Sequence, residues 1–223
     1  MATLAELQGQ LRRIAGDRMA SDPAHDLAHL DRVWINAKSI ADTRTNMRVL
    51  LAACYLHDLV NVPKNAPDRH LASQHSAEKA APILANLDYT PVEIQATQHA
   101  IAAHSFSANI TPETPEACVL RDADRLDALG AVGIARTFSV AGSLGRALYD
   151  PTDPFAVHRP LNDLQFSVDH WKVKLLKLPS DMLTEGGRSI ARERANRMIR
   201  YLDDFAGEIG ANLPADWASI VDR

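Results

Sequence analysis

A histidine and an aspartate stand side by side where a strongly apolar segment of the chain ends. The segment VLLAACYL, residues 49–56, runs directly into His57 and Asp58, and a loop with a proline follows. Imidazole and carboxylate groups are suitable ligands for Mn²⁺, Fe²⁺, Co²⁺, Ni²⁺ or Zn²⁺. A capped helix end would also explain this dipeptide, so a metal site requires ligands from other segments.

Two other segments carry residues of the same types. His29 lies in HDLAHLDRV, and the segment RDADRLDALGA holds the three aspartates Asp122, Asp124 and Asp127. His25 precedes His29 by four residues, so the two share one face of a helix and form a candidate pair. The spacing does not decide among the three aspartates. These segments lie far apart along the chain and can meet only through tertiary folding.

Apolar residues recur at helical spacing along most of the chain. The segment of residues 45–59 is apolar on nearly all sides, so we expect it at the centre of the core. Residues 90–104 begin with Thr-Pro-Val-Glu, a typical start of a helix. The sequence shows no convincing strand pattern and no repeat. We predict helices over residues 1–16, 21–41, 45–59, 73–87, 90–104, 116–138, 163–178 and 187–209.

Glycine and proline interrupt this helical pattern. Gly130 and Gly133 indicate a break or a close approach within the segment 116–138. Residues 139–160 hold glycine, proline and aspartate without periodicity, so we expect an ordered loop over a functional face. The predicted fold is all-α, with the whole chain forming one domain. Its metal-binding core would span about 20–140, with C-terminal helices over about 160–209 packed on it.

Composition limits the kinds of protein to consider. The chain has 223 residues, 46% of them hydrophobic, and a formal net charge of −4, which suits one globular domain. Mild acidity without a run of Lys and Arg argues against nucleic acid as the main partner. No signal peptide or membrane span is evident, so we expect a cytoplasmic protein without a membrane partner. Cys54 and Cys118 lie among aliphatic residues, and both are expected to be buried free thiols.

With these segments the sequence resembles the HD superfamily of metal-dependent phosphohydrolases, whose pattern is H…HD…D on a helical bundle. Within it the chain is similar to a bacterial group linked to nucleotide pyrophosphohydrolase activity. The likeness spans roughly residues 20–205, and its landmarks are HDLAHLDRV, AACYLHDL, AAHS, RDADRLDALGAVGIARTF, GRALYDP and HWKVKLLKL. The short, proline-bearing loop after His57 and Asp58 departs from the family pattern and leaves the substrate preference open.

The resemblance implies a single-domain HD-type helical bundle that holds one divalent metal ion. Mn²⁺ is the favoured ion, and Fe²⁺, Co²⁺, Ni²⁺, Zn²⁺ or Mg²⁺ are alternatives. The resemblance assigns the metal ligands to His29, His57, Asp58 and Asp124. Arg125 is then expected to pair with nearby carboxylates.

Other residues are candidates for binding phosphate or for moving a proton. Arg32 follows His29 by three residues and is either a phosphate clamp or a solvated arginine. Asp58 or Asp127 is a candidate proton acceptor. His104 matches the HS landmark of the family and is expected at the phosphate or in proton transfer. Because no P-loop or dinucleotide-binding glycine motif is present, side chains must hold the phosphates.

The remaining candidates concern the rest of the substrate. Arg146 and Tyr149 lie in the irregular span and are expected to contact the substrate. His170 and Lys174, four residues apart on one helix face, are also expected to contact the substrate, although packing within the fold is an equal interpretation of this pair. Candidates for stacking on a base are Trp34, Phe106, Tyr149, Phe155 and Trp171. Histidines expected at the surface or at the rim of the site are His70, His75, His99 and His158. His25 is expected to cap its helix or to support the ligands.

The expected function is metal-dependent hydrolysis of nucleotide phosphoanhydrides or phosphoesters. The leading reaction, which rests on the resemblance, converts a (deoxy)nucleoside triphosphate to the monophosphate and pyrophosphate. The alternatives are a 5′-nucleotidase or phosphodiesterase on the same metal site and a non-catalytic nucleotide-binding module. The expected partner is a small-molecule nucleotide, and assembly into a homo-oligomer is left open.

Overall fold

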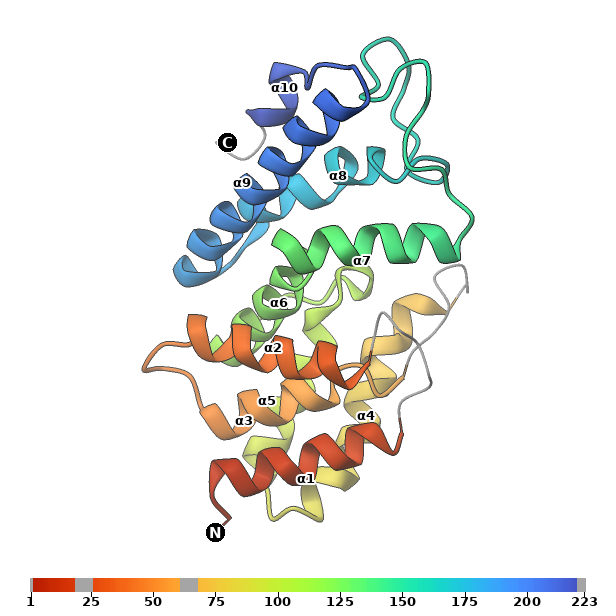
Figure 1. Ribbon diagram of the computed structural model, residues 1–223. Coiled ribbons are helices and arrows are strands. Elements are labelled where there is room, and N and C mark those ends of the chain that lie inside the picture. The colour runs from red at the N-terminus through yellow and green to blue at the C-terminus, as the bar shows by residue number, and fades with distance from the viewer. Residues whose placement is uncertain (1, 19–25, 61–67, 220–223) are drawn as a thin grey trace. The chain divides into compact units, whose positions relative to one another are not determined.

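Helices are the regular elements of this protein. The computed structural model describes residues 2–18, 26–60 and 68–219 of the chain. Within these ranges the nearest approach to a sheet is one isolated β-bridge, between Ala147 and Phe166 (Figure 1). The all-α prediction is therefore confirmed.

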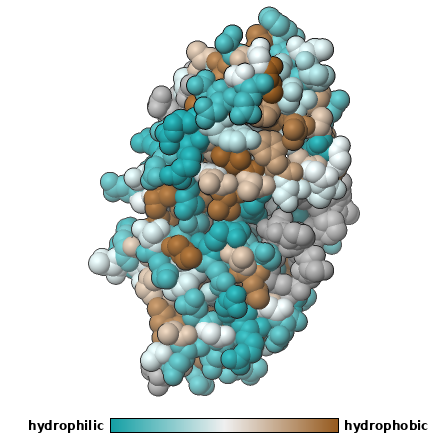
Figure 2. Space-filling model, viewed as in Figure 1, coloured by the Kyte–Doolittle hydropathy of each residue, from teal (hydrophilic) through white to brown (hydrophobic). Residues whose placement is uncertain are grey.

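The chain divides into two compact units, Met1–Asp124 and Arg125–Arg223. The packing of the C-terminal helices on the metal-binding core, within one domain, stays a prediction. No helix in the described part of the chain is long and apolar enough to span a membrane. Hydrophilic residues cover much of the face seen in Figure 2, and hydrophobic residues gather in separate groups between them.

A central helix organises the first unit. The elements of this unit are α1 (Leu4–Gly16), α2 (Leu27–Ile40), α3 (Met47–Leu56), η1 (Arg69–Leu71), α4 (Ala72–Ala85), α5 (Pro91–His104), η2 (Phe106–Ala108) and α6 (Pro115–Leu126), which continues into the second unit. The central helix is α3, which packs against α1, α2, α4 and α5 (Figure 1). Every side chain from Val49 to Leu56 is buried, so the predicted place of this segment in the core is confirmed.

Side chains at the helix starts explain where the helices begin. Thr90 and Glu93 form the capping box that the sequence predicts, and Pro91 opens α5. Asp26 caps α2, because its Oδ1 accepts the backbone N–H of His29 at 2.8 Å. This bond fixes the first turn of the helix that carries His29.

The second unit contains the C-terminal helices. Its elements after α6 are α7 (Gly130–Ser143), α8 (Asp169–Val173), the 3₁₀ helix η3 (Leu175–Asp181), α9 (Glu185–Glu208) and α10 (Ala215–Ala218). The helix predicted over residues 187–209 is α9, and its buried face is formed by Gly187, Ala191, Ala195, Met198, Leu202 and Ala206. This face packs against α7 and η3.

The turn between α6 and α7 requires glycine at two positions. Gly130 has a φ of +71°, a conformation that glycine adopts without the steric cost of a side chain. A Cβ atom on Gly133 would lie 2.2 Å from the backbone oxygen of Ala128. The predicted break in the segment 116–138 is confirmed.

The irregular span begins at residue 144, later than predicted. α7 continues to Ser143 and ends where Gly145, at φ +66°, makes a left-handed turn and the N–H of Arg146 donates to the oxygen of Ala141. Further along, the carboxylate of Asp153 accepts the backbone N–H groups of residues 157–159. These bonds order the loop, as expected.

The prediction of one helix over residues 163–178 is wrong. α8 spans only Asp169–Val173, and Lys174 leaves the helical conformation with φ −131° and ψ −60°. In η3 the successive residues Leu175 and Leu176 are both buried. The tighter 3₁₀ conformation buries both leucines, whereas the sequence prediction assumed a continuous helix of 3.6 residues per turn.

Candidate metal centre

His57 directly follows the last residue of α3 and is 1% exposed. Its Nδ1 lies 2.9 Å from the backbone oxygen of Cys54, a carbonyl at the helix end that has no partner within the helix. Because a carbonyl can only accept, Nδ1 carries the proton and Nε2 keeps its lone pair. Nε2 is buried and has no hydrogen-bond partner among the described residues.

His104 repeats this arrangement at the end of α5. Its Nδ1 donates to the backbone oxygen of Ile101 at 2.6 Å, so its Nε2 also keeps a lone pair. The rings of His57 and His104 meet edge to face, with centroids 4.9 Å apart. Two helix ends thus each present an imidazole whose Nδ1 is held by a backbone carbonyl three residues earlier.

Asp58 faces three imidazole rings. Its Oδ2 lies 3.5 Å from Nε2 of His57 and 3.9 Å from Nε2 of His29. Its Oδ1 lies 3.9 Å from Nε2 of His104. The side chains of Asp58 and Asp124 are 22% and 32% exposed, whereas the three histidines are at most 9% exposed, so solvent reaches the cluster at its two carboxylates.

Asp124 joins the cluster from α6. Its Oδ1 lies 3.5 Å from Nε2 of His29, and the rings of His29 and His57 have centroids 5.6 Å apart. The buried side chain of Asn36, on α2, donates to the backbone oxygen of Ala123 at 3.0 Å. This bond ties the helix of His29 to the residue that precedes Asp124.

The five side chains form two overlapping groups of candidate metal ligands that share His57. One group is His29, His57 and Asp124, and the other is His57, Asp58 and His104. In each group the ligand atoms lie within 4.8 Å of one another. Two ligands of one ion, with bonds of about 2.1 Å, lie roughly 3.0–3.5 Å apart at angles of 90–110°. The 3.5 Å separations match this range, so the residues fit a divalent metal ion.

Charge and burial act in opposite directions on Asp124. Burial works to raise the pKa of this carboxyl, but in the metal-free protein positive charge on His29, His57 and His104 outweighs burial and holds the pKa below its ordinary value. Asp124 is therefore ionised at neutral pH, as a metal ligand must be.

The two cysteines differ in their surroundings. Cys54 is fully buried in α3, and burial raises the pKa of its thiol, so it stays protonated. Cys118 is only half-buried and its Sγ lies 3.7 Å from the backbone oxygen of Pro112. The prediction of two buried thiols is therefore wrong for Cys118, because it lies near the start of α6 beside the Pro112 loop.

The structure places the other predicted residues of the first unit as follows. Arg32 is half-buried on α2, one turn after His29. Asp122 is fully buried two residues before Asp124, outside both ligand groups. The predicted roles of His25 and of the loop at residues 61–67 lie outside the described residues.

Arg125 and Asp127 form ion pairs in the second unit. Arg125 pairs with Asp181, so its predicted pairing with a carboxylate is confirmed. Asp127 is 2% exposed and its Oδ2 accepts from Nη1 of Arg136 at 2.5 Å. Asp127 therefore has Arg136 as a structural partner. The role of Asp127 as a proton acceptor stays a prediction.

Asp163 brings two of the predicted substrate residues together in the second unit. Its backbone oxygen accepts from Nη1 of Arg146 at 2.7 Å, and its carboxylate lies 2.9 Å from Nδ1 of His170. Lys174 is exposed at the end of α8, and Tyr149 packs edge to face on Phe205 with centroids 5.4 Å apart. Substrate contacts for these residues stay predictions.

Burial separates the five aromatic candidates for stacking on a base. Trp34, Phe155 and Trp171 are at most 2% exposed, so they belong to the core and present no face to a ligand. Tyr149 is half-buried. Phe106 is 82% exposed and lies two residues after His104. Among the expected surface histidines, His70 and His158 are exposed, and His75 and His99 are half-buried.

The sequence did not show that His104 shares Asp58 with the other histidines. The available signal was its position: His104, like His57, stands at the end of a helix, where the ring can bind a terminal carbonyl. Asn36 was missed altogether, because a polar residue on a helix gives no sign of a partner 87 residues away.

Comparison with known proteins agrees with this geometry. Residues 26–129, which include the whole cluster, match the HD domain family. The YpgQ protein of Bacillus subtilis is 30% identical over 190 residues, covering 83% of this chain and 84% of that protein.

Solved structures show the same fold. The structure of B. subtilis YpgQ in complex with ADP has a TM-score of 0.69 at 30% identity and covers 91% of this chain and 97% of its own. An HD-superfamily hydrolase from Bacillus thuringiensis has a TM-score of 0.72 at 30% identity, covering 94% of this chain and all of its own. The H…HD…D residues, their meeting in one cluster and these likenesses lead to one conclusion: the chain belongs to the HD domain superfamily.

Proposed function

We propose that this protein is a metal-dependent phosphohydrolase of nucleotides, which converts (deoxy)nucleoside triphosphates to monophosphates and pyrophosphate. The observation that carries the proposal is that His29, Asp58 and Asp124 lie close to His57, whose buried Nε2 has no hydrogen-bond partner among the described residues. The complex of YpgQ with ADP supports nucleotide binding, because that relative shares the fold over nearly its whole length.

The metal ligands in this proposal are the four residues of the H…HD…D pattern. Hydrogen bonds from neighbouring groups orient these residues. The backbone carbonyl of Cys54 holds the ring of His57, and the side chain of Asn36 links α2 to α6. A bound divalent ion, Mn²⁺ in the favoured version, supplies a water of lowered pKa and neutralises charge on the phosphate.

The reaction requires a group that accepts a proton from the attacking water. The water oxygen bonds to the α-phosphorus, the bond from this phosphorus to the bridging oxygen breaks, and pyrophosphate leaves. Oδ1 of Asp58, one of the two carboxylates that solvent reaches, lies 3.9 Å from Nε2 of His104, and both atoms can accept a proton. We assign proton transfer to this pair and phosphate binding to Arg32, one turn after His29.

Phe106 is the residue proposed to hold the base. The first unit contains four aromatic residues, and Trp34, Tyr55 and Tyr89 are at most 5% exposed. Phe106 is the exposed one, and it begins η2, which is separated from His104 by Ser105 alone. An aromatic side chain left in solvent beside a polar cluster is a suitable platform for a purine or pyrimidine ring.

A nucleotide panel tests the proposal. The full chain is treated with a chelator, reloaded with Mn²⁺ and incubated with nucleoside triphosphates, monophosphates and cyclic nucleotides, while pyrophosphate and orthophosphate are both measured. Pyrophosphate from triphosphates supports the proposal. Orthophosphate from monophosphates alone indicates a 5′-nucleotidase, and opening of cyclic nucleotides indicates a phosphodiesterase. Nucleotide binding without turnover under every divalent metal indicates a binding module.

A further inference from the structure

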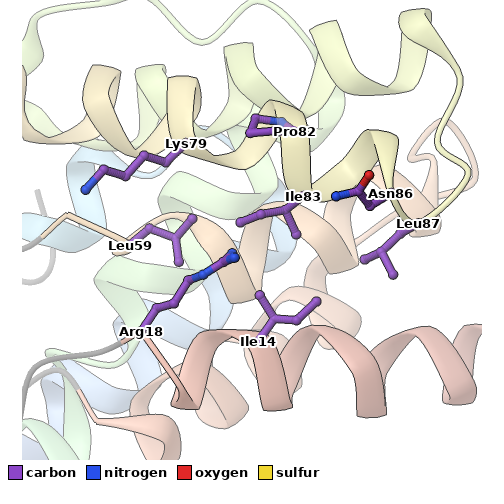
Figure 3. A pocket seen from close by; sticks show the side chains of 8 residues that line it. All are labelled: Ile14, Arg18, Leu59, Lys79, Pro82, Ile83, Asn86 and Leu87. Carbon is purple, nitrogen blue, oxygen red and sulfur yellow. The ribbon is translucent and has the colours of Figure 1, made fainter.

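A pocket of about 530 Å³ lies between α1 and α4 of the first unit, and none of the described residues that line it belongs to the metal centre (Figure 3). Its apolar wall is formed by Ile14, Leu59, Ile83 and Leu87. Protein pockets that hold small molecules have volumes of about 300–1,000 Å³ and are mostly apolar with a few polar groups. The size and the lining of this pocket therefore suit a small organic molecule.

The charged groups of the pocket have one sign. Arg18 and Lys79 line it, and none of the described side chains around it is a carboxylate. In Figure 3 the guanidinium of Arg18 extends between Leu59 and Ile14 toward Ile83. The guanidinium of Arg18 thus lies beside an apolar surface, in a protein whose net charge is negative. This combination favours a ligand that has an anionic group and an apolar body.

We infer that this pocket binds a small amphipathic anion, in which a hydrocarbon chain or a ring system carries a carboxylate or a phosphate. The apolar body contacts Ile14 and Ile83, and the anionic group pairs with Arg18 and Lys79. Leu59 lines the pocket and directly follows Asp58 of the metal cluster. An occupant therefore touches the turn that positions a candidate metal ligand.

Two probes distinguish the two sources of such a ligand. Decanoate represents an acyl carboxylate, and decyl phosphate represents an alkyl phosphate, which carries no base for the proposed nucleotide site. Acetate and inorganic phosphate carry the same anionic groups without the apolar body, and serve as their controls. Binding to the full-length protein is measured by isothermal titration calorimetry. We expect decanoate or decyl phosphate to bind one molecule per chain, and acetate and phosphate to bind more than about tenfold more weakly.

Variants locate the bound probe. The double substitution Arg18→Met and Lys79→Met keeps the apolar stems and should weaken binding by at least about tenfold, because two charge-assisted bonds are lost. The matched control is Arg13→Met with Lys177→Met, two exposed cations that do not line the pocket. Asn86→Trp, at an exposed position of the lining, should block entry, and its melting temperature reports folding.

Three results would overturn the inference. The first is that neither probe saturates the wild-type protein. The second is that the control double variant weakens binding as much as the pocket variant. The third is that folded Asn86→Trp binds the probe as the wild type does. None of these measurements depends on turnover, so they leave the proposed hydrolase activity to its own test.

Discussion

The Nδ1 of His57 lies 2.9 Å from the backbone oxygen of Cys54, three residues earlier, and this bond directs the opposite nitrogen into the candidate metal centre. The end of α3 therefore provides a candidate metal ligand as well as a partner for its own terminal carbonyl. In a neutral imidazole, the proton on Nδ1 that the terminal carbonyl accepts leaves Nε2 without a proton, which is the form that a metal ligand requires.

Replacing His57 with glutamine tests this relationship. Glutamine lacks the ring that binds Cys54 and presents Nε2, so we expect the rise in melting temperature on adding Mn²⁺ to be largely lost and turnover to fall by at least about 100-fold. The matched control is His158→Gln, at an exposed histidine of the second unit whose side chain has no hydrogen bond to any described residue. A full metal-induced rise in His57→Gln would remove His57 from the ligand set.

Phe106→Ala should affect nucleotides and spare a substrate without a base. Loss of stacking is worth about 1–3 kcal/mol by analogy with base–aromatic stacking in nucleic-acid binding, which corresponds to a five- to 150-fold rise in KM. Inorganic tripolyphosphate has no base, so its KM should not change. Phe106→Trp keeps a stacking surface and should retain the wild-type KM. An equal change for both substrates would contradict the assignment of Phe106 to the base.

Arg146→Ala tests the predicted substrate contact of the loop. Arg146 holds the backbone of Asp163, so we expect a small loss of stability, of about 1 kcal/mol, together with a larger rise in KM. Arg146→Lys keeps the charge and should recover part of the KM. Melting curves and steady-state kinetics measure both effects, and a lower melting temperature with unchanged kinetics would show that Arg146 is structural.

The loop before α8 should make stability sensitive to acid. The backbone N–H groups of residues 157–159 hold the pKa of Asp153 below its ordinary value. A lowered pKa in the folded state stabilises the protein above the unfolded pKa of about 3.9, and this contribution is lost as the pH falls through the folded value. We expect Asp153→Asn to lower the free energy of unfolding at pH 7, and the difference from wild type to shrink below about pH 4.

Urea unfolding between pH 7 and pH 2.5 measures this difference. Asp203→Asn, an exposed aspartate of α9, is the control and should behave as the wild type at every pH. A difference for Asp153→Asn that stays constant down to pH 2.5 would show that the ionised carboxylate is not its source.

The sequence predicts the fold better than it predicts the site. Central α3, the start of α5 at Thr90 and the break at Gly130 follow from local patterns that burial and backbone geometry enforce. The segment 163–178 shows a limit of local patterns. Leu175 and Leu176 are both buried in the core, and this tertiary packing outweighs the local preference for a continuous helix.

The candidate site could be predicted only in part. The resemblance supplied the four candidate ligand positions, but spacing alone could not choose Asp124 from its neighbours, because the choice depends on how α6 faces α2. The tie between Asn36 and Ala123 that sets this orientation is a long-range contact. Exposure, which separates Phe106 from the buried aromatic residues, is likewise a property of the folded chain.

The most direct measurement of the central claim is turnover of a nucleoside triphosphate by Asp58→Asn at saturating Mn²⁺, with the melting curves of the apo and metal-loaded forms. The amide keeps the shape of Asp58 and removes the charge that faces His29, His57 and His104. We predict that pyrophosphate release falls by at least about 100-fold and that the metal-induced rise in melting temperature largely disappears, while the apo form melts at or above the wild-type temperature. Near-normal pyrophosphate release with a normal metal-induced rise would contradict the account.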